Sequence, residues 1–101
     1  MVISGLSQVS GCTASNNNTS NTSGEAGMQL VGAGSRVDSN HLANNSFAGL
    51  TAQGVVGNII IRNTFYGAQS IIDPGNISGP GVIMSSGGTI GSTNPWANIY
   101  Y

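Results

Sequence analysis

Three segments, 7–17, 35–45 and 58–68, align without gaps and read SQVSGCTASNN, SRVDSNHLANN and NIIIRNTFYGA. Val9 and Val37 are 28 residues apart, and Val37 and Ile60 are 23 residues apart. Internal repeats of about 20 to 50 residues are typical of solenoids and related stacked architectures. A period in the low twenties without a helical segment is the length of one β-helix coil. We therefore expect an all-β stack of about three coils.

The aligned residues should stack on one another, because strands of neighbouring coils lie about 4.8 Å apart. The alignment predicts two inward-facing columns, Val9–Val37–Ile60 and Ala14–Leu42–Phe65. A second, shorter match follows the aligned segments of the first two coils, because Gly27–Leu30 aligns with Gly49–Ala52. The first repeat is longer than the second because it carries an inserted loop at residues 18–23.

Cys12, Asn40 and Asn63 align at a turn between two strands. Asparagine tolerates the left-handed backbone conformation, and its amide can hydrogen-bond to the asparagine of the next coil. We expect both properties at this turn. Cys12, the only cysteine, cannot form an internal disulfide and is expected to be a small stacked side chain, not a reactive thiol.

The composition excludes several classes of function. Only 5% of the residues are charged, against about 25% in ordinary soluble domains, and the net charge is −1. Two cations give no electrostatic footprint for nucleic acid or an anionic membrane. The sequence has no zinc-ligand spacing, no cofactor motif, no visible signal peptide and no run of about 20 apolar residues. We expect no metal, no cofactor, no nucleic-acid partner and no membrane span.

Segments 9–17, 35–41 and 57–64 resemble coils of the right-handed parallel β-helix repeat proteins of the pectate-lyase-like superfamily. Residues 94–100, NPWANIY, resemble the C-terminal end of many uncharacterised bacterial members. The resemblance spans residues 7–101. It implies a right-handed parallel β-helix with coils in 1–79, a capping tail in 80–101, and an extracellular or cell-surface location. Family members of known activity are mostly polysaccharide lyases and hydrolases, with phage tailspikes among them.

By resemblance, such enzymes would need clustered carboxylates and a basic residue on one outer face. This chain has three acids in all, and no acid stacks on Asp38, because the matching positions are Ser10 and Ile61. Arg36 and Asp38 lie two apart on one strand, so they should form an exposed pair of little energetic value. A lone carboxylate cannot build a calcium site. The sequence therefore predicts a protein that is not an enzyme.

Two further polar residues fall at the turn. His41 is expected to be a solvated turn residue and not a general base. Arg62 is expected to bond turn carbonyls, with contact to a ligand as the alternative.

The candidate interaction surfaces are apolar. Ile59 and Ile61 stand where the other coils have polar residues, and with Tyr66 they should form an outward apolar patch, covered by the tail or by a second subunit. Val2 and Ile3 read as strand from the start, so the first coil should present an uncapped edge.

We therefore expect a non-catalytic structural or binding module that self-associates, as a fibre or oligomer subunit, through the N-terminal edge or the outer apolar face. The alternative is an extracellular carbohydrate-binding module, or the C-terminal fragment of a polysaccharide lyase or hydrolase. A neutral polar loop suits a glycan, and its candidate ligand residues are Asn18, Thr19, Ser20, Asn21, Thr22 and Ser23. An ice-binding solenoid would need an unbroken threonine column, and His41 interrupts it between Thr13 and Thr64.

Overall fold

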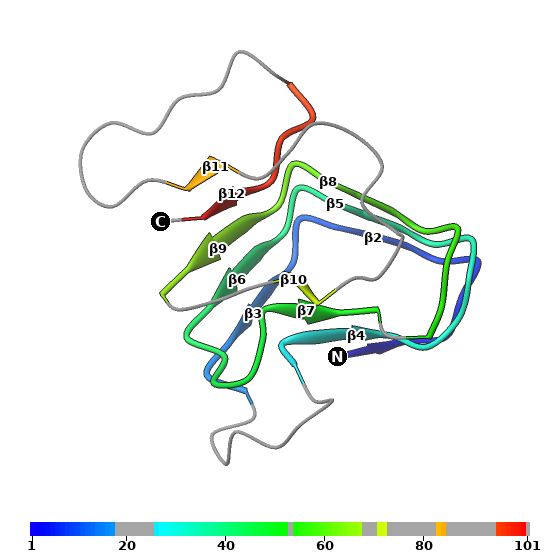
Figure 1. The fold of residues 1–101 in the computed structure, drawn as a ribbon, viewed down its shortest axis with the longest axis horizontal. Coiled ribbons are helices and arrows are strands. Elements are labelled where there is room, and N and C mark those ends of the chain that lie inside the picture. Colours follow the sequence, from blue (N-terminus) through cyan, green and yellow to red (C-terminus); the bar gives the residue numbers. More distant parts are fainter. Residues whose placement is uncertain (18–25, 53, 68–70, 73–82, 85–94, 101) are drawn as a thin grey trace.

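The computed structural model describes residues 1–17, 26–52, 54–67, 71–72, 83–84 and 95–100. Every regular element in this part of the chain is a β-strand (Figure 1). In chain order the strands are β1 (Val2–Ile3), β2 (Gln8–Ser10), β3 (Thr13–Ser15), β4 (Met28–Leu30), β5 (Arg36–Asp38), β6 (His41–Ala43), β7 (Leu50–Thr51), β8 (Ile59–Ile61), β9 (Thr64–Tyr66), β10 (Ile71–Ile72), β11 (Ile83–Met84) and β12 (Ile99–Tyr100).

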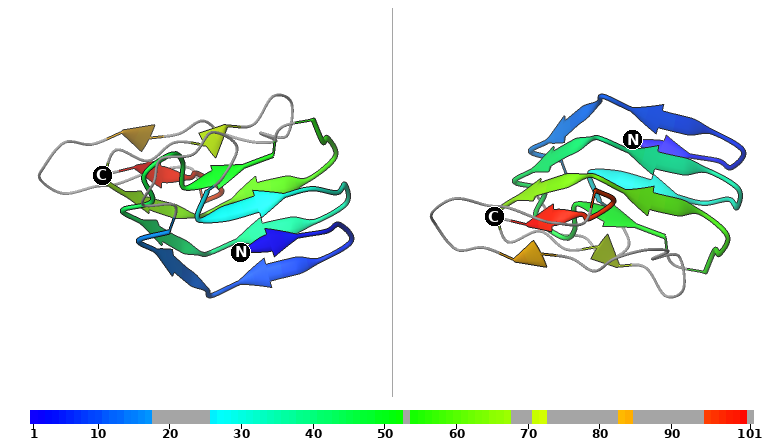
Figure 2. Two further views of the ribbon diagram at one scale, coloured as in Figure 1. Left: turned by 90° about the horizontal axis from the view of Figure 1, so that it is seen from below. Right: turned by 90° about the horizontal axis from the view of Figure 1, so that it is seen from above.

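The strands form three parallel sheets with the orders β1-β4-β7-β10, β2-β5-β8 and β11-β12-β9-β6-β3. The chain visits the three sheets in turn, so β1–β3 form a first coil, β4–β6 a second and β7–β9 a third (Figure 2). The all-β, parallel character expected from the repeat is confirmed. Three stacked parallel sheets are compatible with a β-solenoid.

The strand register agrees with the gapless alignment. Val9 pairs with Val37 and Val37 with Ile60, while Ala14 pairs with Leu42 and Leu42 with Phe65, so both predicted columns are confirmed. Each coil has a third strand beyond the aligned pair. The match of Gly27–Leu30 with Gly49–Ala52 predicted the position of this strand correctly, because Met28 pairs with Leu50.

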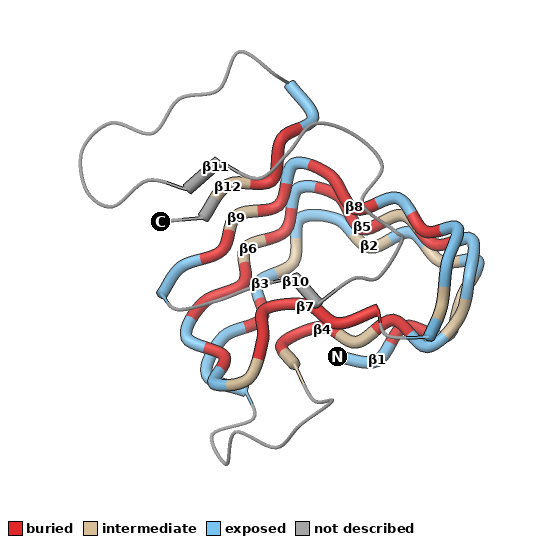
Figure 3. Tube along the Cα trace, in the orientation of Figure 1, coloured by how far each residue is buried: buried red, intermediate tan, exposed pale blue. Residues whose placement is uncertain are grey.

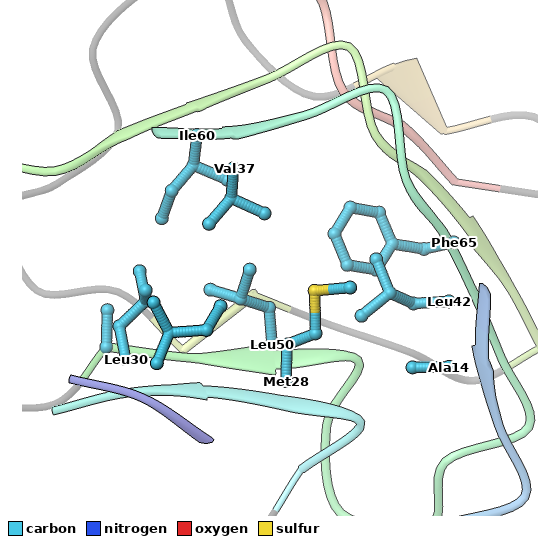
Figure 4. Packing of buried hydrophobic residues seen from close by; sticks show 10 residues of the cluster. Ala14, Met28, Leu30, Val37, Leu42, Leu50, Ile60 and Phe65 are labelled. Carbon is cyan, nitrogen blue, oxygen red and sulfur yellow. The ribbon is translucent and has the colours of Figure 1, made fainter. Parts of the chain in front are cut away.

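The hydrophobic core lies between the three sheets, and Figure 3 marks the buried stretches of their strands. Figure 4 shows side chains of all three sheets pointing toward one another. Val37, Leu42 and Phe65 are fully buried. Phe65 fits against Gly49, where an added Cβ would lie 2.4 Å from the phenyl Cδ1. A short glycine-containing connection is therefore needed before β7 to make room for the largest core side chain.

The described part of the tail continues the third sheet. β12 pairs with β9, and β11 pairs with β12 on its other side. The predicted capping segment 80–101 thus contributes parallel strands. The predicted insertion loop, 18–23, lies outside the described residues.

Candidate functional site

At the corner between the second and third sheets, the chain bends from one sheet into the next, and each coil has one left-handed residue there. These residues are Gly11, Ser39 and Arg62, with φ of 65°, 58° and 55°. Asn40 and Asn63 each follow the left-handed residue and are not themselves left-handed. The prediction that asparagine takes this conformation is therefore wrong. The residue before it makes the turn, and the asparagine supplies a side-chain amide.

The predicted amide stacking is confirmed at this corner. The N–H of Cys12 donates to Asn40 Oδ1, the N–H of Asn40 donates to Asn63 Oδ1, and the N–H of Asn63 donates to Asn98 Oδ1, each at 3.0 Å. All three asparagines are buried. We call this column the asparagine ladder. It extends through the tail, because Asn98 supplies the amide for the third coil.

Each ladder amide also donates hydrogen bonds. Asn40 Nδ2 donates to the carbonyl of Val9 and to Asn63 Oδ1, and Asn63 Nδ2 donates to the carbonyl of Val37 and to Asn98 Oδ1. The backbone partners always belong to the preceding coil. The ladder is therefore directional: each coil satisfies the corner of the coil before it, as buried polar groups require.

The corner that leads from the third sheet to the first uses the same chemistry. Asn45 Oδ1 accepts from the N–H of Asn17 at 3.0 Å, and Asn45 Nδ2 donates to the carbonyl of Ala14. The residues before the two asparagines, Asn16 and Asn44, are left-handed. Sequence reasoning missed this second column, although Asn17 and Asn45 both end their aligned segments.

At the third corner, between the first and second sheets, the column of acceptors contains both serine and asparagine. The N–H of Ser7 donates to Ser35 Oγ at 3.3 Å, and the N–H of Ser35 donates to Asn58 Oδ1 at 2.8 Å. Leu6, Gly34 and Gly57 precede these residues and have positive φ. All three corners therefore repeat one device, a left-handed residue followed by a side-chain acceptor that points toward the preceding coil.

Asp38 lies at the centre of an ionic cluster on the outer side of β5. It accepts from Arg36 Nε and Nη2 at 3.1 and 2.9 Å, from Arg62 Nε at 2.7 Å, and from Ser39 Oγ at 2.8 Å. Arg62 Nη2 also bonds Asp38 Oδ2. The guanidinium of Arg62 lies 5.2 Å from the ring centroid of Trp96, a cation–π distance.

Two predictions about this cluster need correction. The Arg36–Asp38 pair forms, but its carboxylate is not exposed: the Asp38 side chain is 6% accessible, because two arginines and a serine cover it. Arg62 was expected to bond turn carbonyls, yet its side chain reaches Asp38. The side chains of Arg36 and Arg62 stay 39% and 42% exposed, so the cluster lies at the surface.

The electrostatics follow from these bonds. The hydrogen bond from Arg62, with help from Ser39 and Arg36, holds the pKa of Asp38 well below its usual value of 3.8, although burial opposes this shift. The same bond raises the pKa of Arg62. At neutral pH Asp38 is thus an ionised acceptor with hydrogen-bond donors at both carboxylate oxygens.

The other candidate polar residue is His41. The prediction of a solvated turn residue is wrong, because His41 is the half-buried first residue of β6. Its Nδ1 lies 2.8 Å from Thr64 Oγ1 in the next coil. Within the described ranges, no group of three or more His, Cys, Asp or Glu side chains could hold a metal ion.

The predicted interface residues divide into two groups. Val2, Ile59 and Tyr66 are exposed, at 67%, 41% and 47%. Ile3 and Ile61 are buried, at 4% and 5%. Ile3 belongs to the hydrophobic core. Ile61 pairs with Asp38 and so lies on the outer side of its sheet, but its side chain is covered. The exposed apolar patch on β8 is therefore smaller than the sequence suggested. The six candidate loop residues lie outside the described part of the chain.

The outer edge of the first coil is not covered by any described strand. Among the described strands, β1, β2 and β3 are each the outermost strand at the same end of their sheets. The carbonyls of Ile3, Ser7 and Cys12 accept bonds from the second coil, and the N–H of Asn16 donates to it. In a parallel pair, alternate residues bond to the same neighbour. The N–H and C=O groups of the intervening residues therefore point away from the second coil, and these residues are Val2, Gln8, Ser10, Thr13 and Ser15.

Comparison with known proteins gives no match to a family model, a curated protein or a solved structure. In the described residues there is no helix with the length and apolar character needed to cross a membrane.

Proposed function

We propose that this chain is a non-catalytic structural module that associates with copies of itself through the outer edge of the first coil. In this proposal the fold is a right-handed parallel β-helix related to the pectate-lyase-like superfamily, and the protein acts outside the cell or at its surface. Parallel strand crossovers are right-handed in almost all known cases, which supports the handedness.

The observation that carries the proposal is the outer edge of β1, β2 and β3, which no described strand covers. Natural edge strands are blunted by lysines, prolines, bulges or covering segments, because an open edge templates pairing with another chain. Residues 1–17 contain no charged side chain and no proline. The side chains that flank the open backbone groups are exposed and neutral, as at Gln8, Ser10 and Thr13.

The corners of the first coil add support. Ser7 and Asn17 occupy the positions that Ser35 and Asn45 occupy in the second coil, where they serve the coil before them. The first coil thus carries polar corner side chains of the kind that join coils. Ser7 Oγ donates to the carbonyl of Gly5, and Asn17 Nδ2 donates to Asn45 Oδ1. What supports the proposal is the position of both residues in the corner columns.

The test is a concentration series of the purified chain, followed by sedimentation equilibrium and negative-stain electron microscopy. The wild type should associate as the concentration rises. Ser15→Lys should weaken association strongly, because it places a charge beside the open edge of β3. Tyr66→Lys is the matched control, because Tyr66 lies in the same outward column two coils away and should leave association unchanged. A wild type that stays monomeric at every concentration would refute the proposal.

A carbohydrate-binding module is the second candidate. The observation in its favour is that Trp96 and Tyr66 are both half-exposed, and that Arg62 holds Trp96 from one side. Aromatic faces at a surface offer apolar area with little loss of side-chain entropy on binding. Titration with neutral and acidic oligosaccharides, monitored by Trp96 fluorescence, tests this candidate. Unchanged emission at millimolar ligand would remove it.

A further inference from the structure

Both arginines of the chain lie in the ionic cluster. Arg36 belongs to β5 and Arg62 directly follows β8, and the sequence contains no lysine. Both side chains reach Asp38, which is the only acidic residue that the structure describes. A chain with very few charges therefore brings its two arginines, from two different coils, to a single carboxylate.

The cluster carries more positive charge than Asp38 needs. A buried carboxylate must be paired, and one arginine is sufficient to neutralise it. Two guanidiniums and one carboxylate leave a formal charge of +1. The two guanidiniums also repel each other across the carboxylate that they share. A second anion bound to both arginines would cancel the excess charge and offset this repulsion.

The two arginines retain hydrogen-bond donors for such an anion. A guanidinium has five N–H groups, and Asp38 accepts only from Nε and Nη2 of each arginine. Within the described part of the chain, Nη1 of Arg36 and of Arg62 has no acceptor. The arginine side chains are 39% and 42% accessible, whereas Asp38 is 6% accessible. An anion that approaches from solvent therefore meets the arginines and not the like charge of Asp38.

Both arginines are ordered without a ligand. Each bonds Asp38 through two nitrogen atoms, and the guanidinium of Arg62 also lies 5.2 Å from the ring centroid of Trp96. A side chain that is already restrained loses less conformational entropy when it binds a ligand. This distinguishes the cluster from two unrestrained surface arginines.

We propose that Arg36 and Arg62 form a binding site for a tetrahedral oxyanion, phosphate or sulfate, either free or carried as an ester. A planar carboxylate matches the fork of one guanidinium, whereas a tetrahedral group directs its oxygens out of a single plane and can accept from both. The site belongs to the second and third coils. The inference is therefore independent of self-association through the first coil.

The arginine Nε–H signals in a nitrogen–proton NMR spectrum give the first test, because two arginines yield only two such signals. Sodium sulfate and sodium phosphate should shift both signals in a saturable way, and sodium chloride at equal ionic strength should not. Equal shifts with chloride would mean that the salts only screen the charges, and would overturn the site. Sodium acetate that binds as tightly as sulfate would overturn the tetrahedral ligand.

A pair of phosphate titrations separates the two sources of the anion. Phenyl phosphate should bind more tightly than inorganic phosphate if the site recognises an ester, because its ring can extend toward the half-exposed Trp96 beside Arg62. Equal or weaker binding of phenyl phosphate would identify the free anion as the ligand.

Two variants separate the site from the net charge of the protein. Arg36→Gln should weaken sulfate binding about tenfold, followed at the Arg62 signal, because it removes one of two charged donors. Arg36→Gln/Tyr66→Lys restores the net charge on β9 of the third sheet and should bind as weakly as Arg36→Gln. Circular dichroism checks that both variants fold, and the titration of the wild type decides the question if they do not. Recovery of sulfate binding in the double variant would overturn the site, because net charge alone would then explain the binding.

Discussion

The asparagine ladder and the ionic cluster join the same two coils by different chemistry. Asn40 and Asn63 are uncharged and buried, and they bond the backbone of the preceding coil. Asp38 bonds two arginine side chains that stay partly exposed. The ladder recurs in the second coil, the third coil and the tail, because each corner leaves the same backbone groups to satisfy. The cluster occurs once among the described residues, where a carboxylate and two arginines happen to meet.

This difference predicts which interaction holds the stack together. A buried donor or acceptor that loses its partner costs its full desolvation penalty, and a ladder residue serves several such groups at once. An ion pair with solvated partners gains little, because water and salt already screen the charges. The ladder should therefore dominate stability and strand register, and the cluster should contribute a smaller, condition-dependent amount.

The largest effect is expected for Asn63→Ala. The substitution removes the acceptor of the Asn40 N–H and the donor to the Val37 carbonyl, both within the buried corner. We expect a loss of about 3 kcal/mol in the free energy of unfolding, since each orphaned buried group costs roughly 1–3 kcal/mol. Urea unfolding followed by circular dichroism measures it.

The matched control for this variant is Ser46→Ala, at an exposed side chain in a connection of the second coil. Its free energy of unfolding should stay within about 0.5 kcal/mol of the wild type. Equal unfolding midpoints for the two variants would show that the ladder does not dominate the stability of the stacked coils.

A smaller effect is expected for Asp38→Asn. The neutral amide keeps one acceptor oxygen but leaves two guanidiniums without their counter-charge. Both guanidiniums can turn to water, so we expect a loss of about 1–2 kcal/mol. The loss should shrink in 1 M sodium chloride, whereas the Asn63→Ala loss should not. If the loss of unfolding free energy in Asp38→Asn did not depend on salt, the contribution of Asp38 would come from packing and not from charge.

The pH dependence sharpens the same contrast. The pKa of Asp38 is depressed in the folded state, mainly by the hydrogen bond from Arg62. The stabilisation is therefore complete above the unfolded pKa, near 3.8, and is lost as the pH falls below it toward the lower folded value. The free energy of unfolding of the wild type should decline below about pH 4. The decline should be shallower in Asp38→Asn and unchanged in Asn63→Ala. Parallel declines in all three proteins would contradict this assignment.

These two regions also separate what the sequence can predict from what it cannot. Columns such as Val9–Val37–Ile60 follow from the alignment, because parallel strands of successive coils pair residue by residue. The ladder at Asn40 and Asn63 follows in the same way. The alignment could not show which of two adjacent corner residues is left-handed, because serine and arginine seldom mark that conformation.

The cluster escaped prediction for a geometric reason. Asp38 pairs in register with Ile61, and its second arginine is the next residue along, Arg62. A contact that steps diagonally between columns leaves no trace in a gapless alignment. The burial of Ile61 escaped for a related reason, since alternation along a strand predicts the direction of a side chain but not what covers it.

The smallest effect concerns the outer margin of the cluster. Arg62→Gln removes the charge that faces Trp96, which is the only tryptophan of the chain and therefore an unambiguous fluorescent probe. We expect a decrease in the unfolding midpoint no larger than that of Asp38→Asn, because Arg62 donates two bonds to the same carboxylate. We also expect a red shift of the emission, because the half-exposed indole loses the guanidinium that covers one side. Arg36→Gln is the control, because Arg36 bonds the same carboxylate without an observed contact to the indole. If both variants shift the emission equally, the signal reports the loss of the whole cluster; if only Arg62→Gln does, the cation–π contact is an independent tie between the third coil and the tail.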